Sequence, residues 1–317
     1  MPPPHGRRPL TAVKAKLVII LGPTAVGKSD VALDIAAELY GEIVNADSQQ
    51  VYRYLDIGTG KPSVEDRARV PHHLIDLVNP DEEFNAALFR QLAMTGIGDI
   101  HQRERNAIVC GGTGFYLKAL TQGLFVGPGQ DSRIREKLER DIGENGLAVV
   151  YNRLVKIDPS VTSTIHPNDR QRIIRALEVF ELTGKPLSEW QKEHAFGDDP
   201  YEIVKIGLNR DRAELYDRIN RRCERMIQNR LFEEVRGLIS KGYGLELKPL
   251  RSVGYRQMGA VLNGVLSLED ALEEMKQETR HLAKRQLTWF RSDTEIRWFH
   301  PENQKREIFQ TVREFLQ

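Results

Sequence analysis

The residues of this sequence best suited to chemistry form a short glycine-containing segment that follows an apolar run. Residues 17–21 are apolar, and the next residues fit the pattern G-x-x-x-x-G-K-[ST] with Gly22, Gly27, Lys28 and Ser29. Glycine permits backbone dihedrals that are closed to other residues, so backbone N–H groups can turn inward around a phosphate chain. The pattern predicts a site for a di- or triphosphate, with Lys28 on the terminal phosphate and the Ser29 hydroxyl on Mg²⁺. The predicted phosphate-binding residues are Gly22, Pro23, Thr24, Ala25, Val26, Gly27, Lys28 and Ser29.

Two further apolar runs end in polar residues of kinds that catalysis uses. Residues 42–46 read as a short strand that ends at Asp47 and Ser48, and residues 107–110 precede a glycine turn that holds Thr113. Functional groups collect at the carboxyl ends of strands in a doubly wound sheet, so Asp47 and Thr113 should lie near the phosphate-binding loop. Taken alone, Asp47 is better explained as a helix cap or turn residue. Thr113 also suits a helix N-cap, a role compatible with a place in the site.

The order of these segments predicts the fold class and the domain organisation. Strand, glycine turn and helix follow one another at residues 17–39 and again at residues 107–117, which indicates an α/β fold with a P-loop NTPase-like parallel sheet flanked by helices. From residue 131 to about residue 190 the pattern is helical throughout, and residues 201–208 read as a returning strand. We therefore predict a discontinuous core, residues 15–130 and 200–317, with a helical insertion domain at residues 131–199 and a disordered Pro-rich leader at residues 1–14.

Composition narrows the class of protein without choosing a function. The chain has 317 residues, a net charge of +1 and no apolar run long enough to cross a membrane. Its two cysteines, Cys110 and Cys223, lie far apart without metal-ligand spacing, so a disulfide framework is not expected. These features favour a cytoplasmic protein, and nothing in them indicates more than a monomer.

The last third of the chain carries uneven positive charge. Arg218, Arg221, Arg222 and Arg225 are spaced to share one helix face, and residues 280–291 hold several basic side chains and no acidic one. Trp289 and Phe290 lie among them, and residues 251–257 form a glycine-containing turn with two arginines and a tyrosine. Basic groups mixed with aromatic rings suit a nucleic-acid backbone with exposed bases. The alternative is a solvated helix face with both aromatic rings in the core.

Several motifs, taken in one order, resemble the tRNA dimethylallyltransferases of bacterial type, also called tRNA isopentenyltransferases. The resemblance runs from about residue 17 to residue 299. Its matching stretches are residues 22–29, 47–52, 56–62, 71–76, 111–113, 166–169, 171–179, 251–257 and 284–291.

The resemblance implies an activity and roles for individual residues. The family transfers a dimethylallyl group from dimethylallyl diphosphate to N6 of the adenosine 3′ of the anticodon, at tRNA position 37, and releases diphosphate. Here Lys28, Mg²⁺ near Ser29 and Arg222 would stabilise the charge that develops on the diphosphate. Asp47 matches the general base that hydrogen-bonds N6 and takes its proton, and Thr113 matches the residue that positions the amine.

The resemblance also implies where tRNA would bind. Four segments match the family's tRNA-contacting segments, and Arg135 in the helical insertion matches a further contact with the anticodon stem-loop. Together with Thr113, the implied tRNA-binding residues are Asp47, Ser48, Gln49, Gln50, Arg135, Gln171, Arg172, Ile173, Ile174, Arg175, Arg251, Ser252, Val253, Gly254, Tyr255, Arg256, Lys284, Arg285, Gln286, Leu287, Thr288, Trp289, Phe290 and Arg291.

Three other functions use some of the same features. A small-molecule kinase would use the same loop for ATP but would not need a basic C-terminal third. An adenylate isopentenyltransferase would share the loop and Asp47 but take a free nucleotide, and the segments at Arg251 and Lys284 argue against it. An RNA-binding protein with a phosphate-binding switch would not need Asp47 and Thr113 beside the loop. The sequence also argues against a motor-type ATPase, because Cys110 occupies the position where those proteins carry an acidic residue.

Overall fold

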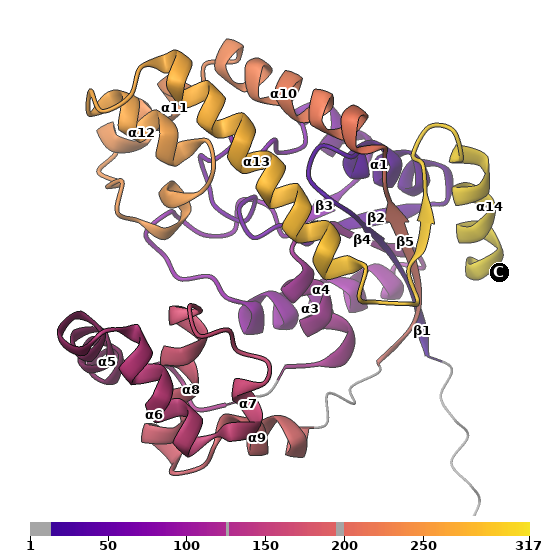
Figure 1. Cartoon of the computed structure of the whole chain (residues 1–317). Helices are drawn as coiled ribbons and strands as arrows, with labels where there is room; N and C mark the ends of the chain where they lie inside the picture. The colour runs from indigo at the N-terminus through magenta and orange to yellow at the C-terminus, as the bar shows by residue number, and fades with distance from the viewer. Residues whose placement is uncertain (1–13, 125–126, 195–199) are drawn as a thin grey trace, which may run out of the picture. The chain divides into compact units, whose positions relative to one another are not determined.

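The computed structural model describes residues 14–124, 127–194 and 200–317 (Figure 1). The predicted leader lies outside the described residues except for Lys14. The chain divides into two compact units, one made of Met1–Thr121 with Asp199–Gln317 and the other of Gln122–Asp198. No helix of the described residues is both long and apolar enough to cross a membrane.

The first unit is built on a fully parallel sheet in the order β3-β2-β4-β1-β5-β6. Its central strand β1 holds five consecutive buried apolar residues, Leu17 to Leu21, as expected for a strand covered on both faces. The strands predicted near residues 17–21, 42–46, 107–110 and 201–208 are all present, which confirms the α/β fold class. The strands are β1 (Ala15–Leu21), β2 (Gly41–Asn45), β3 (His72–His73), β4 (Asn106–Gly111), β5 (Tyr201–Leu208) and β6 (Arg297–Phe299).

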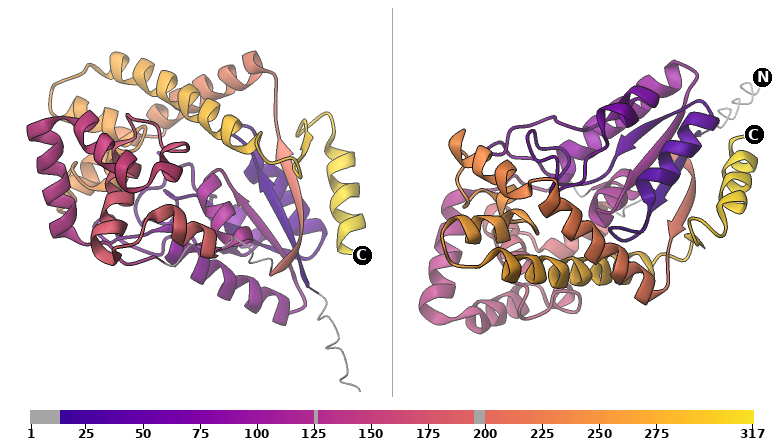
Figure 2. Two further views of the ribbon diagram at one scale, coloured as in Figure 1. Left: turned by 60° about the horizontal axis from the view of Figure 1, so that its bottom comes forward. Right: turned by 90° about the horizontal axis from the view of Figure 1, so that it is seen from above.

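The helices of the first unit pack around the sheet and against one another. The helix α3 begins where the Asn85 side chain accepts hydrogen bonds from the N–H groups of Ala87 and Leu88. Helices α10 and α13 pack side by side, and α14 contacts β5 (Figure 2). The helices of this unit are α1 (Lys28–Glu38), α2 (Val64–Arg69), α3 (Ala86–Gln102), α4 (Gly114–Gln122), α10 (Arg212–Gln228), α11 (Leu231–Ser240), the 3₁₀ helix η1 (Lys248–Arg251), α12 (Tyr255–Leu262), α13 (Leu268–Phe290) and α14 (Lys305–Leu316).

The second unit is helical throughout the part of it that the structure describes. Aspartates open three of its helices, because the side chains of Asp131, Asp158 and Asp169 each accept a backbone N–H of the following turn. Its core includes Leu138, Leu154, Ile173 and Leu177. The helices are α5 (Ser132–Asn145), α6 (Leu147–Ile157), α7 (Pro159–Thr162), α8 (Arg170–Thr183) and α9 (Leu187–His194).

Candidate active site

The loop that joins β1 to α1 has the conformation its glycines allow. Gly22 has a φ of 145° and Gly27 a φ of 105°, both in the region that side chains disfavour. A Cβ at Gly22 would also lie 2.6 Å from the carbonyl oxygen of Leu208 on β5. Helix α1 begins at Lys28 without a side-chain cap, so its first N–H groups are left for a ligand. The start of the helix, with its positive dipole end, is therefore an anion-binding position.

A cleft of about 980 Å³ opens in front of this loop. Gly27, Lys28 and Ser29 line it at the start of α1, and arginines of α10 line it from across the cleft. These are Arg218, Arg222 and Arg225. Arg221 does not line the cleft but pairs with Asp217 one helical turn earlier, at 2.8 Å. Arg221 lies at the edge of the helix face that the four arginines share, so only three of them reach the cleft.

Lys28 lies among charged groups at the end of the sheet. Its Nζ donates a hydrogen bond to the carbonyl oxygen of Pro23 at 2.7 Å. Burial lowers the pKa of Lys28 to about 8; nearby Asp47 opposes this shift and Arg222 adds to it. Burial also lowers the pKa of Arg222, against the attraction of Asp47. A bound diphosphate would supply the negative charge that both buried cations need.

Asp47 and Thr113 lie at the ends of neighbouring strands, β2 and β4. The N–H of Ala46 donates to the carbonyl oxygen of Cys110 at 2.8 Å, so the sheet pairing continues to the residue before Asp47. The Thr113 hydroxyl oxygen accepts from the N–H of Ser48 at 3.0 Å. One Asp47 oxygen accepts from the N–H of Gln49 at 2.8 Å. The two residues singled out in separate parts of the sequence are thus brought together beside the phosphate-binding loop.

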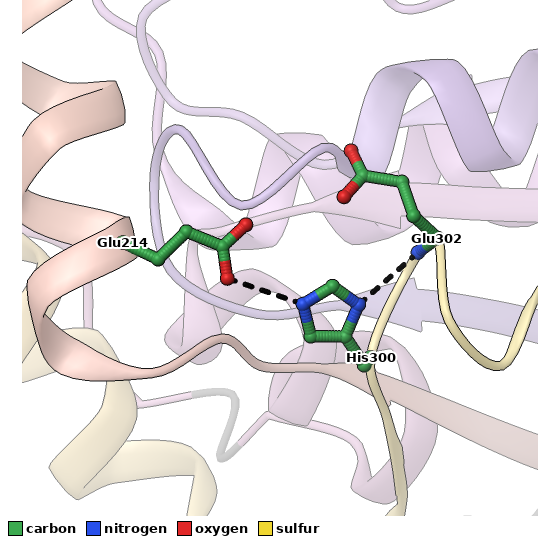
Figure 3. A group of neighbouring side chains, drawn as sticks. All are labelled: Glu214, His300 and Glu302. Atoms are coloured by element: carbon green, nitrogen blue, oxygen red, sulfur yellow. Dashed lines mark hydrogen bonds and ion pairs between the residues drawn. The ribbon is translucent and has the colours of Figure 1, made fainter.

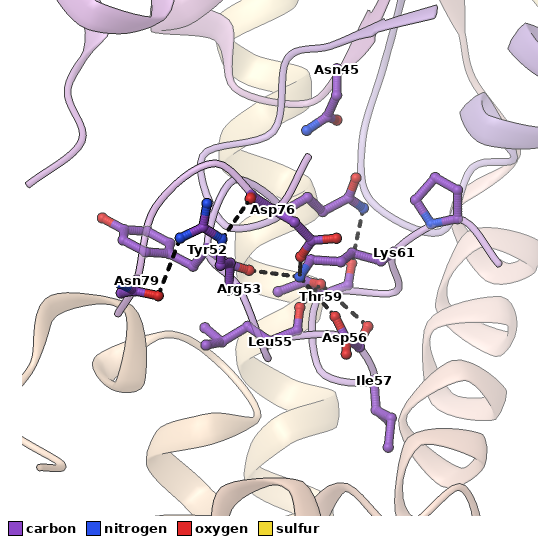
Figure 4. Close-up of polar contacts among 12 residues, drawn as sticks. Asn45, Tyr52, Arg53, Leu55, Asp56, Ile57, Thr59, Lys61, Asp76 and Asn79 are labelled. Atoms are coloured by element: carbon purple, nitrogen blue, oxygen red, sulfur yellow. Dashed lines mark hydrogen bonds and ion pairs between the residues drawn. The ribbon is translucent and has the colours of Figure 1, made fainter. Parts of the chain in front are cut away.

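A second loop, residues 56–62, forms another wall of the cleft, and Figure 4 shows polar contacts of its residues. Its Lys61 side chain is only 2% exposed, and its Nζ donates to Asp56 at 2.7 Å, to Asp76 at 2.5 Å and to the carbonyl oxygen of Tyr52 at 2.6 Å. Burial alone would raise the pKa of Asp76, but hydrogen bonds from Lys61 and Arg67 lower it overall. The sequence analysis assigned no role to Lys61. Its position between Gly60 and Pro62 in a polar loop is the one local feature that could have pointed to it.

The segment 251–256 was predicted to contact tRNA as a whole, and the structure separates its residues. Arg251 and Arg256 are exposed, and Arg256 pairs with Glu278 at 2.6 Å. Tyr255 is 0% exposed, and its hydroxyl donates to Glu234 at 2.6 Å. Tyr255 therefore belongs to the interior of the unit, and its ring is not a surface for RNA.

The segment 284–291, on the last turns of α13, is also divided. Lys284, Arg285, Thr288 and Arg291 are exposed, and the Trp289 ring is 40% exposed. Phe290 is 3% exposed and belongs to the core, so the interpretation that placed both rings in the core holds for Phe290 but not for Trp289.

Gln286, in the same segment, is used inside the protein. The N–H of Thr24 donates to its Oε1 at 2.8 Å, and its Nε2 donates to the carbonyl oxygen of Gly112 at 2.9 Å. This one amide joins the phosphate-binding loop to the glycine turn that carries Thr113. Gln286 was predicted to contact tRNA; in this structure both polar ends of its amide have partners within the protein.

The second unit carries the remaining predicted contacts. Gln171 and Arg172 are exposed on α8, whereas Ile173 and Ile174 are buried in the helical core, so their side chains cannot reach a surface ligand. The guanidinium groups of Arg135 and Arg175 both donate to Glu178, whose side chain is 0% exposed. Burial opposes ionisation of Glu178, but the hydrogen bonds from Arg135 and Arg175 lower its pKa overall.

Glu214, His300 and Glu302 form a cluster with the spacing of metal ligands (Figure 3). The two carboxylates already have a cation, because Arg210 donates to both and its side chain is 1% exposed. Arg210 also donates from Nε to the carbonyl oxygen of Val26 at 2.9 Å. The cluster thus neutralises an arginine that holds the phosphate-binding loop, and we assign it no metal ion.

The parallel sheet, the loop and the cleft define a phosphate-binding protein of the P-loop class. A family model described as IPP transferase matches residues 50–293. The chain is 51% identical over 302 residues to the tRNA dimethylallyltransferase of Geobacter metallireducens. The aligned residues cover 95% of this chain and 98% of the Geobacter protein. This chain therefore belongs to the IPP transferase family, that of the tRNA dimethylallyltransferases, as its motifs predicted.

Solved structures agree with this assignment. The full-length tRNA isopentenylpyrophosphate transferase of Bacillus halodurans is 39% identical, with a TM-score of 0.71 over 96% of this chain and 97% of that one. A eukaryotic dimethylallyltransferase acting on tRNA is 28% identical, with a TM-score of 0.80 over 95% of this chain and 79% of that one.

Proposed function

We propose that this protein transfers a dimethylallyl group from dimethylallyl diphosphate to N6 of adenosine 37 of tRNA, 3′ of the anticodon, and releases diphosphate. The observation that carries the proposal is the meeting of the phosphate-binding loop, Asp47 and Thr113 at the carboxyl end of the sheet. The family relationship supports the same reaction.

The donor diphosphate binds between the loop and α10. The N–H groups at the start of α1, Lys28 and Arg222 all face a cleft large enough for it. These groups stabilise the diphosphate as the C–O bond breaks and negative charge gathers on the leaving oxygen. Ser29 is exposed in the cleft beside Lys28, a position suited to a ligand of Mg²⁺ that otherwise binds diphosphate oxygens and water. When bound, Mg²⁺ neutralises part of the diphosphate charge.

The acceptor amine binds at the ends of β2 and β4. N6 of the adenine forms a bond to the first carbon of the dimethylallyl group as the bond from that carbon to the diphosphate oxygen breaks. The nitrogen then carries positive charge, and Asp47 takes one of its protons. Thr113, held by Ser48, positions the amine. The adenine leaves its stack to enter the site, which costs least in a single-stranded loop.

The proposed tRNA footprint consists of the exposed basic and polar side chains within the predicted segments. In the first unit these include Arg251, Arg256, Lys284, Arg285 and Arg291, with the Trp289 ring among them. In the second unit Gln171 and Arg172 are exposed, although Arg172 pairs with Asp169 at 3.3 Å, and Arg135 lies partly exposed. The helical unit at about residues 131–199 acts in this proposal as a tRNA-binding insertion. We propose further that the protein works in the cytoplasm as a monomer.

A transfer assay tests the proposal. Purified protein, Mg²⁺ and dimethylallyl diphosphate are incubated with unmodified tRNA that carries adenosine 37, and in parallel with AMP and ATP. Mass spectrometry of the digested products then locates the five-carbon group. Label on adenosine 37 alone is expected. Label on AMP or ATP would instead identify a free-nucleotide enzyme, and transfer of a phosphate from ATP would identify a kinase.

A further inference from the structure

Glu234, on α11, binds four hydrogen-bond donors with one carboxylate. Its Oε2 accepts from the N–H groups of Asp56 at 3.1 Å and Ile57 at 2.8 Å. Its Oε1 accepts from the N–H of Gly58 at 3.3 Å and from the Tyr255 hydroxyl at 2.6 Å. Three consecutive N–H groups of the loop at residues 56–62 are therefore held by a side chain 176 to 178 residues away.

Tyr255 packs against the same loop beside Glu234. Its ring lies directly against Gly58, where a Cβ would be 2.6 Å from the ring carbon that bears the hydroxyl. Burial and the neighbouring Glu234 raise the pKa of Tyr255 well above its usual value, so the hydroxyl stays a donor. Tyr255 opens α12 directly after the segment that presents Arg251 to solvent.

The far end of the loop contacts Arg222. The Nη2 of Arg222 donates a hydrogen bond to the carbonyl oxygen of Thr59 at 3.0 Å. Gly60 has a φ of 61°, and a Cβ there would lie 2.6 Å from the same Nη2. The guanidinium group that faces the diphosphate cleft is therefore placed by the backbone of residues 59–60.

We propose that Glu234 is a positioning residue that fixes the loop at residues 56–60. This loop contacts Arg222 at one end and the buried Tyr255 at the other. Through Tyr255 it is joined to the arginine turn at residues 251–256. The proposal rests on the proposed function, because it assigns Arg222 to the diphosphate and the turn to tRNA. Occupancy of the arginine turn and the placement of Arg222 are then mechanically linked through one carboxylate.

The variant Glu234→Gln tests the link. Glutamine keeps the size of the side chain but replaces one acceptor oxygen by an NH₂ group, which cannot accept from the loop N–H groups. We expect kcat to fall about tenfold, in line with the loss of hydrogen bonds to a charged group. The matched control is Glu233→Gln, because Glu233 is the neighbouring carboxylate and, among the described residues, its one ion pair is a 3.9 Å contact with Arg230. It should retain full activity.

A double-variant cycle separates positioning from general damage. If Glu234 acts through Arg222, adding Glu234→Gln to Arg222→Gln should lower kcat by less than a further twofold. A full tenfold loss in that background would overturn the proposal. Should Glu234→Gln fail to fold, the same cycle with Glu234→Asp, whose shorter side chain withdraws the carboxylate from the three loop N–H groups, decides between the same two outcomes.

Binding of inorganic diphosphate keeps this test separate from the transfer reaction. Calorimetry should show weaker binding to Glu234→Gln than to the wild type and no further weakening when Arg222 is already replaced. Absence of prenyl transfer in the wild type would refute the proposed function, whereas equal diphosphate affinity in wild type and Glu234→Gln would refute the positioning role.

Discussion

The Nε of Arg210 donates a hydrogen bond to the carbonyl oxygen of Val26 at 2.9 Å, joining the connection between β5 and α10 to the phosphate-binding loop. Arg218 makes the same kind of bond to the carbonyl oxygen of Ala25 at 3.0 Å. The loop turns its N–H groups toward the ligand, so its carbonyl groups must point elsewhere and find donors there. Two arginines that reach the loop from outside it supply those donors.

Replacement of Arg210 by Gln should destabilise the folded protein. Glu302 and Glu214 would lose their shared cation, and the Val26 carbonyl would lose its donor. We expect the free energy of unfolding to fall by about 1–3 kcal/mol, below the value for fully buried pairs because both carboxylates are partly exposed. Urea denaturation measures this change. The variant Arg212→Gln, at an exposed position of α10, serves as the control, and an equal loss there would contradict the assignment.

Replacement of Asp47 by Asn should abolish most of the transfer while tRNA still binds. Asparagine keeps the shape of the side chain but cannot accept the proton from N6, and loss of a general base typically costs about 10²–10⁴ in rate. Single-turnover transfer and tRNA binding are measured on the same preparation. A rate within tenfold of the wild type would refute the role of Asp47 as general base.

Diphosphate binding should be coupled to protonation of Lys28. Burial lowers the pKa of this amine to about 8, and an anion in the cleft would raise it again. Proton uptake on binding dimethylallyl diphosphate is therefore expected between about pH 8 and 9, with affinity falling as pH rises through that range. Calorimetry in buffers of different ionisation enthalpy measures the uptake. In Lys28→Arg the charge no longer titrates there, and persistence of the uptake would mean that another group causes it.

The lowered pKa of Lys28 also makes stability depend on pH: stability rises with pH where the affinity for diphosphate falls. Between pH 8 and the ordinary lysine value of 10.5, the unfolded chain holds more protons at Lys28 than the ligand-free folded protein does. The contribution of Lys28 to the free energy of unfolding therefore rises with pH in that window. The difference between wild type and Lys28→Met in denaturation midpoint, followed across these pH values, shows whether it does.

Affinity for tRNA should fall steeply as salt concentration rises. Each lysine or arginine that contacts a phosphate releases counterions, so removing one contact lowers the slope of log K against log salt by about 1. Arg251→Gln and Lys284→Gln should each show this reduction. Arg313→Gln, whose side chain pairs with Glu38 at 2.6 Å outside the proposed footprint, should leave the slope unchanged. Equal slopes in all three variants would refute the footprint.

Replacement of Gln286 by Glu should affect the reaction more than tRNA binding. A carboxylate cannot donate to the carbonyl oxygen of Gly112, so the connection between the phosphate-binding loop and the turn of Thr113 would break on one side. We expect kcat to fall about tenfold, and the neutral variant Gln286→Met, which lacks both bonds without adding charge, should fall similarly. A loss confined to tRNA affinity would return Gln286 to the surface role predicted from the sequence.

The sequence alone determined the elements whose signals are local. The apolar run at residues 17–21 and the glycines that follow it predicted a strand, a phosphate-binding loop and a helix, since hydrophobic period and glycine position act over a few residues. The same reasoning predicted β2, β4 and β5 and placed Asp47 and Thr113 at strand ends. β6 was missed because Arg297–Phe299 is too short to show a period.

Only the tertiary structure decided which side chains of a predicted surface segment face the interior of the protein. Tyr255, Gln286, Ile173 and Ile174 lie in segments that read as surface contacts, yet their side chains have partners or neighbours inside the protein. Those partners are distant in sequence; Thr24 and Gln286 are 262 residues apart. No local pattern specifies such a pair, because it exists only after the sheet and its covering helices have packed. The links from Glu234 to the cleft loop and from Arg210 to Val26 arise in the same way.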